Sequence, residues 1–316
     1  MIKYSIVVPV YKSSKSLEIL TKQLLELADR TSYEFELILV NDSPFHGETN
    51  VALQKICAEE NWIKVITLRK TQGQHLALLI GMAHASGDYI ITMDDDLQHP
   101  VNEIPKLIRA IESNDWIDAI FAVPHYNKKK HSLFRNVGSF ILNKTDSALL
   151  RKPKGLIKSP FRIITKDIAN NIVVNFNATP LVSSLLINAT SNIINIHVEH
   201  HSRQFGRSNY TLRMLISLTL NNILHYSSLP LKFMGIVGIA GFIFSMLFIM
   251  ATITRKIFYE IDYPGYTSTV SLISFFGGLN LLAVGLIGEY LIRIIKEQQK
   301  PNLEGLIRKS RSQTHI

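Results

Sequence analysis

Three aspartates, Asp94, Asp95 and Asp96, end the apolar run in the stretch YIITMDDDLQHP. Adjacent carboxylates repel one another, so their clustering suggests that they bind a cation rather than support the fold. In an extended backbone, residues i and i+2 point to the same side, so we expect Asp94 and Asp96 to converge while Asp95 turns away. Carboxylates combined with phosphate oxygens suit Mg²⁺ or Mn²⁺. An Asp-x-Asp pair alone is a weak signal, because many acidic turns are simply solvated.

Short β-branched runs alternate with helical patterns through the first half of the chain. The runs 4–10, 35–42, 63–68, 88–94 and 116–124 are predicted strands, and 17–30, 51–60, 74–85 and 101–113 have helical spacing. This alternation predicts an α/β domain with a parallel, doubly wound sheet. Ligands of such sheets bind at the carboxyl ends of the strands, where residues 9–11, 41–43 and 94–96 stand. No GxGxxG or GxxxxGK[ST] motif occurs, which argues against a nicotinamide enzyme or a P-loop nucleotidase.

Two long apolar segments follow the predicted α/β part. Residues 233–254 and 268–290 are each long enough to cross a hydrocarbon core of ~30 Å; two buried helices of a soluble protein are the alternative. The link between them has balanced charge, whereas the second segment is followed by Lys296, Lys300, Arg308, Lys309 and Arg311. By the positive-inside rule, both chain ends are expected in the cytoplasm.

Residues 210–230 are amphipathic with few charges, which predicts a helix lying in the membrane interface; a core helix of the soluble domain is the alternative. The predicted organisation is a catalytic domain over 1–209, this juxtamembrane helix, a transmembrane hairpin over 231–295 and a basic cytoplasmic tail over 296–316. The first apolar run is too short for a signal peptide, so we expect the catalytic domain on the cytoplasmic side of an inner (plasma) membrane.

The 34 Lys and Arg residues against 25 Asp and Glu give a net charge of +9. This excess suggests a nucleic acid, an anionic membrane or a phosphorylated substrate as partner. Nucleic acid is not expected, because the positive charge concentrates beside the apolar segments. The single cysteine, Cys57, excludes an internal disulfide. His197, His200 and His201 have an H-x-x-H spacing without a helical HExxH pattern, so zinc is not predicted.

Four stretches carry a joint signature: SIVVPVYKSSKSL, FELILVNDSP, QGQHLALLIGMAHASGDYIITMDDDLQHPVNEIPKL and HSRQFGRSNYTLRML. Together they resemble the membrane-anchored family 2 glycosyltransferases that attach a sugar to a polyprenyl phosphate. The resemblance covers residues 4–293 in order and is specific for the family, though not for the sugar. It implies a GT-A, Rossmann-like nucleotide-diphospho-sugar transferase domain, an interfacial amphipathic helix and a two-helix transmembrane hairpin.

The resemblance also implies roles for individual residues. A pocket for the nucleobase and ribose would be lined by Pro9, Val10, Tyr11 and Asp42, with His75 beside the nucleotide. Asp94 and Asp96 would hold Mg²⁺ or Mn²⁺ on the donor diphosphate, and Gln98 would approach the reacting centre. Phosphate contacts would come from Arg162, Arg203, Arg207 and Ser208.

An acceptor loop is implied at PHYNKKKHSLFR, which contains Lys128, Lys129 and Arg135. Lysines stand here where the family has arginines, and a merely solvated charged loop is the alternative. As a membrane-surface patch, such a loop would contribute about 1 kcal/mol per Lys or Arg near anionic lipid.

The implied reaction is inverting transfer of a sugar from a nucleotide sugar, UDP rather than GDP by resemblance, to a polyprenyl phosphate such as undecaprenyl phosphate. Its product would serve cell-surface polysaccharide, lipid A or O-antigen modification. An acceptor oxygen that is already anionic needs no strong general base. Two other interpretations stay open: a membrane-bound transferase acting on a hydroxyl acceptor, and an inactive sugar-nucleotide-binding membrane protein. The resemblance also implies a homo-oligomer, specifically a tetramer, assembled through the membrane helices.

Overall fold

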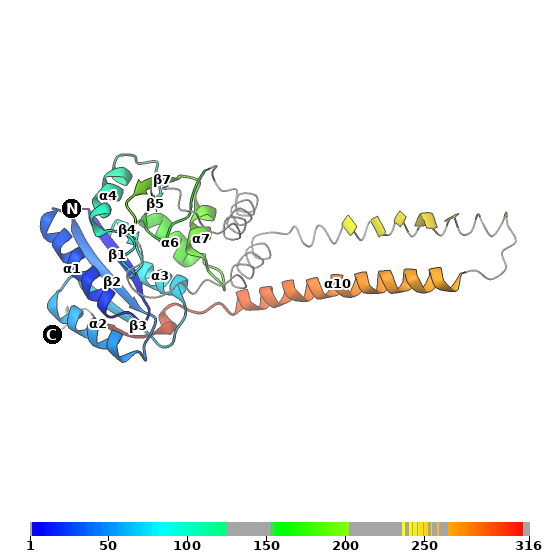
Figure 1. Cartoon of the computed structure of the whole chain (residues 1–316), viewed down its shortest axis with the longest axis horizontal. Helices are drawn as coiled ribbons and strands as arrows, with labels where there is room; N and C mark the ends of the chain where they lie inside the picture. The colour runs from blue at the N-terminus through cyan, green and yellow to red at the C-terminus, as the bar shows by residue number, and fades with distance from the viewer. Residues whose placement is uncertain are drawn as a thin grey trace. The chain divides into compact units, whose positions relative to one another are not determined.

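The computed structural model describes residues 2–124, 153, 155–201 and 265–311, together with separate helical residues between 236 and 258. The chain divides into two compact units, Met1–Tyr210 with Lys300–Ile316, and Thr211–Gln299. Figure 1 shows the sheet and its helices in the first unit and the long helix α10 in the second. The first unit therefore contains chain from both sides of the long helix.

The first unit is built on a sheet of eight strands in the order β7-β5-β6-β4-β1-β2-β3-β8. Its strands are β1 (Lys3–Val10), β2 (Glu34–Asn41), β3 (Ile63–Leu68), β4 (Tyr89–Thr92), β5 (Ala119–Pro124), β6 (Arg162–Thr165), β7 (Ile193–Val198) and β8 (Ile307–Arg311). The predicted α/β class is confirmed, but the prediction of an all-parallel sheet is wrong. β6 runs antiparallel between β4 and β5, and β8 runs antiparallel along β3.

The antiparallel strand β6 has a simple physical origin. Parallel neighbours arise when a single helix returns the chain to the same end of the sheet. β5 and β6 are instead separated by residues 125–161, which is long enough to return the chain in either direction. The reversal places the first residue of β6, Arg162, opposite Thr92 at the end of β4.

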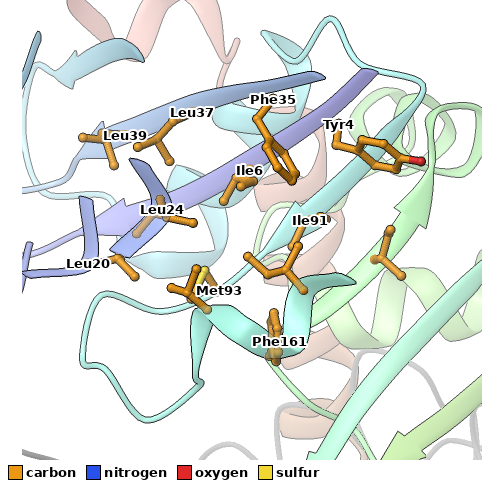
Figure 2. Packing of buried hydrophobic residues seen from close by; sticks show 14 of the residues in the cluster. Tyr4, Ile6, Leu20, Leu24, Phe35, Leu37, Leu39, Ile91, Met93 and Phe161 are labelled. Atoms are coloured by element: carbon orange, nitrogen blue, oxygen red, sulfur yellow. The ribbon is translucent and has the colours of Figure 1, made fainter. Parts of the chain in front are cut away.

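Helices cover the sheet as the alternation of side chains along the strands requires. They are α1 (Lys15–Arg30), α2 (Gly47–Glu59), α3 (Gln74–Ala83), α4 (Ile104–Glu112, preceded by the 3₁₀ turn Val101–Glu103), α6 (Lys166–Val174) and α7 (Val182–Ala189). Tyr4, Ile6 and Val8 of β1 belong to one buried cluster with apolar residues of α1, α2 and α4. Figure 2 shows Ile6, Leu24 and Phe35 within this cluster.

The opposite side of β1 packs against α3 at very short range. A Cβ atom at Gly81 of α3 would lie 2.3 Å from Cγ1 of Val7 and 3.1 Å from Cγ2 of Val40. Only glycine fits there, because both valines are fully buried and stiff at χ1. This close approach fixes α3 over β1 and β2.

The second unit contains α10, which spans Tyr266–Gln298 and is 33 residues long. Among the described residues, one helix is long and apolar enough to cross a membrane, over Phe275–Gln298, with a mean hydropathy of 1.6 and 0% of its apolar window buried. The predicted second span, 268–290, falls within α10. The first span, 233–254, is described only at separate residues, and the predicted interfacial helix, 210–230, lies outside the described residues.

The segment predicted as a basic cytoplasmic tail has a defined structure over much of its length. Residues Glu304–Leu306 form a 3₁₀ turn, and β8 pairs with β3 from Leu68↔Ile307 to Val65↔Arg311. The red C-terminal segment in Figure 1 accordingly runs beside β3. The sequence IRKSR lacks the apolar alternation of an inner strand, but charged side chains are typical of an edge strand.

Candidate functional site

The polar residues singled out in the sequence gather at one edge of the sheet, which we call the ligand edge. It contains the carboxyl ends of β1, β2, β3, β4, β5 and β7 and, because β6 is reversed, the amino end of β6. Val10, Asn41 and Thr92 are the last residues of three of these strands, and Arg162 is the first residue of β6. Loops at this edge of an open α/β sheet are the usual place for a ligand.

Asp42 follows β2 and is held by a backbone cradle. Its Oδ1 accepts a hydrogen bond from the Gln72 amide (2.6 Å), and its Oδ2 accepts one from the Gly73 amide (2.9 Å). The Thr71 hydroxyl donates to the Asp42 carbonyl at 2.8 Å. Burial raises the pKa of Asp42, while the two amide bonds act in the opposite direction. Asp42 is thus fixed in one orientation by the turn that follows β3.

The loop after β1 presents one side chain of the predicted base pocket. Tyr11 is 50% exposed, with the Lys12 ammonium 5.3 Å from its ring centroid. Pro9 and Val10 are buried in the sheet, so they contribute backbone and shape rather than exposed side chains. Lys12 has a positive φ of 51° and its amide donates to the Ser43 hydroxyl at 3.0 Å. The strained φ of a non-glycine residue is typical of loops held for function.

The three aspartates turn toward different partners. Asp94 accepts a hydrogen bond from the side-chain amide of Gln74, at the start of α3. Asp95 accepts one from the Ser13 hydroxyl in the loop after β1. Asp96 accepts a hydrogen bond from the backbone amide of Gln98 at 3.1 Å, within the turn that both residues share. The expectation that Asp95 turns away from the other two agrees with these partners, although Asp95 is tied to the loop after β1 rather than left in solvent.

Burial raises the pKa of Asp95 to about 6, and neighbouring Asp96 acts in the same direction, while the Ser13 and Tyr11 hydrogen bonds oppose it. β4 ends at Thr92, before the aspartates, so the alternation of an extended strand does not itself place them. The turn is set instead by Leu97, whose φ of 60° is unusual for a bulky residue. The predicted arrangement therefore depends on a strained turn rather than on strand pleating.

Arg162 places a buried positive charge beside the aspartates. Its guanidinium is 1% exposed and donates from Nε to the Thr92 hydroxyl (2.9 Å) and from Nη1 to the Ser183 hydroxyl (3.0 Å). Burial lowers its pKa to about 10, and the charge of Asp94 opposes that shift, so the group stays cationic at neutral pH. A buried charge is costly unless an opposite charge compensates it.

Buried polar atoms without a hydrogen-bond partner also occur at this edge. Within the described ranges they include Nε2 of Gln72, Nδ1 of His75 and Nδ1 of His99. Burial lowers the pKa of His75 to about 4, with Arg162 acting in the same direction. Burial similarly lowers the pKa of His99 to about 4, with His200 adding to the shift and Asp96 opposing it. Each neutral ring, and the Gln72 amide, is thus left with a polar atom that a ligand could satisfy.

The chain that follows β7 returns to the same turn. The His201 amide donates to the Gln98 carbonyl at 2.9 Å, and the His200 and His99 ring centroids are 5.2 Å apart. Gln98 is half-buried between these contacts. The predicted phosphate-binding residues Arg203, Arg207 and Ser208 come directly afterwards but lie outside the described residues, as do Lys128, Lys129 and Arg135 of the predicted acceptor loop.

The residues at the ligand edge fit a divalent cation bound together with a diphosphate. Mg²⁺ and Mn²⁺ commonly take one or two protein carboxylates and complete their shell with phosphate and water oxygens. Asp94 and Asp96 would supply such a pair. No group of three or more His, Cys, Asp and Glu residues suited to a metal is found in the part of the chain that the structure describes. A cage made of protein ligands alone is therefore not formed by those residues.

Several site residues were not assigned from the sequence. The backbone amides of Gln72 and Gly73 hold Asp42, Gln74 contacts Asp94, and Ser13 contacts Asp95. A backbone amide is present whatever the side chain, so the residue type does not reveal that Gln72 and Gly73 bind Asp42. The available sequence signal is the glycine that precedes the helix α3. Gly73 has φ 92° and ψ 156°, a conformation almost restricted to glycine.

The fold and this edge define a class of α/β proteins whose ligand site lies at the carboxyl ends of a central sheet. Residues 5–173, more than half of the chain, match Glycosyl transferase family 2. The chain belongs to this family and is a glycosyltransferase. The resemblance noted in the sequence is thereby confirmed at the level of the family.

Relatives extend the similarity over nearly the whole chain. The undecaprenyl-phosphate 4-deoxy-4-formamido-L-arabinose transferase of Photorhabdus laumondii is 30% identical over 301 residues, covering 93% of this chain and 90% of that protein. The protein of the same name from Proteus mirabilis is 27% identical over 299 residues, covering 93% and 90%. A solved structure of glucosyl-3-phosphoglycerate synthase from Mycobacterium tuberculosis, with Mn²⁺, UDP and phosphoglyceric acid, has a TM-score of 0.53 at 16% identity, covering 71% of this chain and 76% of that one. At that identity the likeness shows the fold alone.

Proposed function

We propose that this glycosyltransferase moves a sugar from a UDP-sugar to a polyprenyl phosphate, with inversion at the anomeric carbon, at the cytoplasmic face of the inner membrane. The observation that carries the proposal is the buried Arg162 cation at the ligand edge, whose pKa is lowered by burial and raised by Asp94, in the turn that also contains Asp96. The named activity of relatives covering 93% of the chain supports the choice of a polyprenyl phosphate as acceptor.

The donor would bind across the ends of β1, β2 and β4. The exposed Tyr11 ring offers a stacking surface for a base, and Asp42, held by the turn after β3, offers carboxylate oxygens to the ribose hydroxyls. Mg²⁺ or Mn²⁺ bound by Asp94 and Asp96 would neutralise charge on the diphosphate. Arg162 would stabilise the same charge as it grows on the leaving group, and it is already desolvated before the donor arrives.

The acceptor half of the reaction would need orientation more than acid–base chemistry. A lipid phosphate oxygen is anionic at neutral pH and attacks without losing a proton to a strong base. The segments carrying Lys128, Lys129 and Arg135, and Arg203, Arg207 and Ser208, leave the ligand edge at Pro124 and Val198, the ends of β5 and β7. We propose that these residues bind the acceptor and donor phosphates, with Gln98 beside the reacting atoms.

The membrane part is proposed to be a two-helix hairpin. The described residues Ile243, Phe244, Met246, Leu247 and Met250 of the first apolar segment are all exposed. Within the second unit, a Cβ at Gly241 would lie 3.1 Å from Cε1 of Phe276 in α10, so the two apolar segments approach each other there. Such a hairpin would hold the enzyme beside its lipid acceptor. Assembly of copies through these helices, as a tetramer, completes the proposal.

The test incubates membranes containing the full chain with undecaprenyl phosphate, Mg²⁺ or Mn²⁺, and a panel of UDP- and GDP-sugars, and weighs the lipid product by mass spectrometry. We expect one donor to give a lipid-linked monosaccharide, and we expect Asp96→Asn to reduce its formation by about 100-fold or more. Glycosylation of a hydroxyl acceptor without any lipid-phosphate product would overturn the proposed acceptor. Binding of nucleotide sugar without turnover by any donor would instead indicate an inactive binder.

A further inference from the structure

The C-terminal segment contacts the turn that holds Asp42. We call residues 303–311 the C-terminal strap. Its Leu306 carbonyl accepts the Arg69 amide at 2.8 Å, and its Gly305 carbonyl accepts Nε of Arg69 at 3.1 Å. Arg69 directly follows β3 and begins the turn whose Gln72 and Gly73 amides bind the Asp42 carboxylate. The strap and Asp42 thus contact the same short turn.

The strap is anchored at several points within the first unit. β8 pairs along β3, Leu303 is 8% exposed, and Glu304 lies 3.4 Å from Nε2 of His84, just after α3. Just before the strap, the Lys300 ammonium donates a hydrogen bond to the Phe176 carbonyl at 3.4 Å. It also lies 5.2 Å from the centroid of the Phe176 ring. These contacts span elements far apart in the sequence. The strap therefore has a defined place on the domain rather than a loose association with it.

Apart from its contacts with the strap, the turn after β3 makes three hydrogen bonds to Asp42, from Thr71, Gln72 and Gly73. Arg69 and Lys70 are exposed, and the space that a Cβ of Gly73 would occupy has no neighbouring atom within 4 Å. Without the strap, β3 would be an edge strand with unpaired backbone groups, and the start of the turn at Arg69 would lose its two hydrogen bonds, leaving the bonds to Asp42 to hold the rest. The contacts of Arg69 with the strap restrain the start of the turn that carries the Gln72 and Gly73 amides.

We propose that the C-terminal strap positions the donor site: by holding Arg69 it keeps the turn 69–73 in the shape that orients Asp42 toward the nucleotide. This inference rests on the proposed role of Asp42 in binding the donor. It assigns a positioning function to residues 303–311, which lie beyond the family match at 5–173. It also makes donor binding depend on the chain that follows α10.

The test compares two truncations of the full-length protein in detergent micelles. One chain ends after Asn302 and lacks the strap; the control ends after Arg311 and keeps it. Binding of UDP, with GDP in parallel, is measured by calorimetry in the presence of Mn²⁺. We expect the strap-less chain to bind UDP about 5- to 10-fold more weakly, and the donor KM to rise by the same factor with kcat changed less than about 2-fold. The control should match the complete chain.

A second pair of variants guards against simple misfolding. Arg69→Ala removes the side-chain bond to Gly305 while leaving β8 paired, and it should weaken UDP binding in the same direction; Arg69→Lys, which keeps a donor, should restore part of it. In an Asp42→Ala background the truncation should have little further effect on UDP binding. The strap is proposed to act through the turn 69–73 on Asp42, so the two changes remove the same contribution. Amide hydrogen exchange at Gln72 and Gly73 should speed up in the strap-less chain.

The outcomes separate the inference from the proposed function. If the strap-less chain melts at a lower temperature but binds UDP as tightly as the control, the strap is only structural and the inference is wrong. If the complete chain binds neither UDP nor GDP, the proposed donor site fails and the inference fails with it. Weaker binding that remains fully additive with Asp42→Ala would also overturn the route through Asp42.

Discussion

At the scale of single residues, the ligand edge is notable for charge and polarity kept out of water. Arg162 is 1% exposed and contacts two hydroxyl groups, while the acid that acts on its pKa is Asp94. Such an arrangement sacrifices folding free energy for a cation that is desolvated in advance. The residues that bind the reacting groups should therefore respond to substitution differently from residues that hold the core.

Arg162→Met tests this trade-off directly. Replacing a buried, incompletely compensated cation by an apolar chain of similar volume is often neutral or stabilising, so we expect the melting temperature to stay equal or rise. We expect kcat/KM for the donor to fall by about 100-fold, because leaving-group charge loses its preformed counter-charge. Ser183→Ala, which removes one partner of the guanidinium, is the matched control and should cost far less activity. A variant that loses stability and activity together would show that Arg162 is mainly structural.

His75 should make the folded state sensitive to acid. Its pKa is about 4 in the folded chain against an ordinary value of 6.5, so between these values the unfolded chain binds more protons. The free energy of unfolding should consequently decrease as the pH falls from 6.5 toward 4, by up to about 3 kcal/mol from this group. His75→Asn removes this contribution, so its stability should decline less over that window, as measured by denaturant unfolding in micelles. Parallel curves for the two proteins would contradict a neutral, buried His75.

At the scale of elements, the site depends on turns more than on the strands that precede them. Asp42 is oriented by amides of the turn after β3, and the aspartates are arranged by a turn with Leu97 at φ 60°. Strands fix where each turn begins, but backbone conformation decides where its polar groups point. Substitutions at these turns should therefore act on ligand binding through geometry alone.

Gly73→Ala is the most direct test of this dependence. A side chain at φ 92° and ψ 156° costs about 1–3 kcal/mol, which the turn would relieve by moving the amide that donates to Asp42. We expect donor affinity to drop by about 10-fold, measured as UDP binding. Gly155→Ala serves as the control, because Gly155 also has a positive φ, 80°, in a different segment. Equal losses of UDP binding in both variants would mean that backbone strain, and not the Asp42 contact, is responsible.

Much of the sheet was predictable, because β1 is a nearly continuous apolar run and β2 and β3 are mostly apolar, as strands buried on both faces require. The four-residue β6 was not assigned, since a short run within a long connection has neither a periodic pattern nor a turn signal that gives its direction. β8 was missed for a different reason: the basic sequence IRKSR has the chemistry of a solvated tail as well as of an edge strand. Asp94 and Asp96 could be proposed as ligands from their residue type, whereas Gln72 and Gly73 act through backbone amides that every residue except proline carries.

At the scale of the whole molecule, the protein combines a sheet domain with a long exposed apolar helix. The net charge of +9 and the apolar window over Phe275–Gln298 together suit a protein at an anionic membrane surface. The covalent path from α10 to the C-terminal strap runs through residues 299–302. These few residues give a change in the helix a short covalent route to the strap.

Ile287→Asp should test the membrane assignment of α10. Ile287 lies near the middle of the apolar window and is 51% exposed. A carboxylate at the centre of a span costs about 2.5–3.5 kcal/mol on insertion scales, so we expect a clearly smaller membrane-integrated fraction by carbonate extraction. Ile295→Asp, near the end of the window, should have a weaker effect. Equal integration of all three proteins would show that α10 does not span the bilayer.

The reversed strand β6 has an evolutionary consequence. Because β5 ends and β6 begins at the same edge, residues 125–161 connect two points that both lie at the ligand edge. Lengthening a connection between two fixed points costs little free energy, about 0.6 kcal/mol per doubling. The sheet can therefore keep its strands and the ligand edge while this one stretch is exchanged or resized. Chimaeras that swap residues 125–161 between relatives would test the proposal that this stretch binds the acceptor.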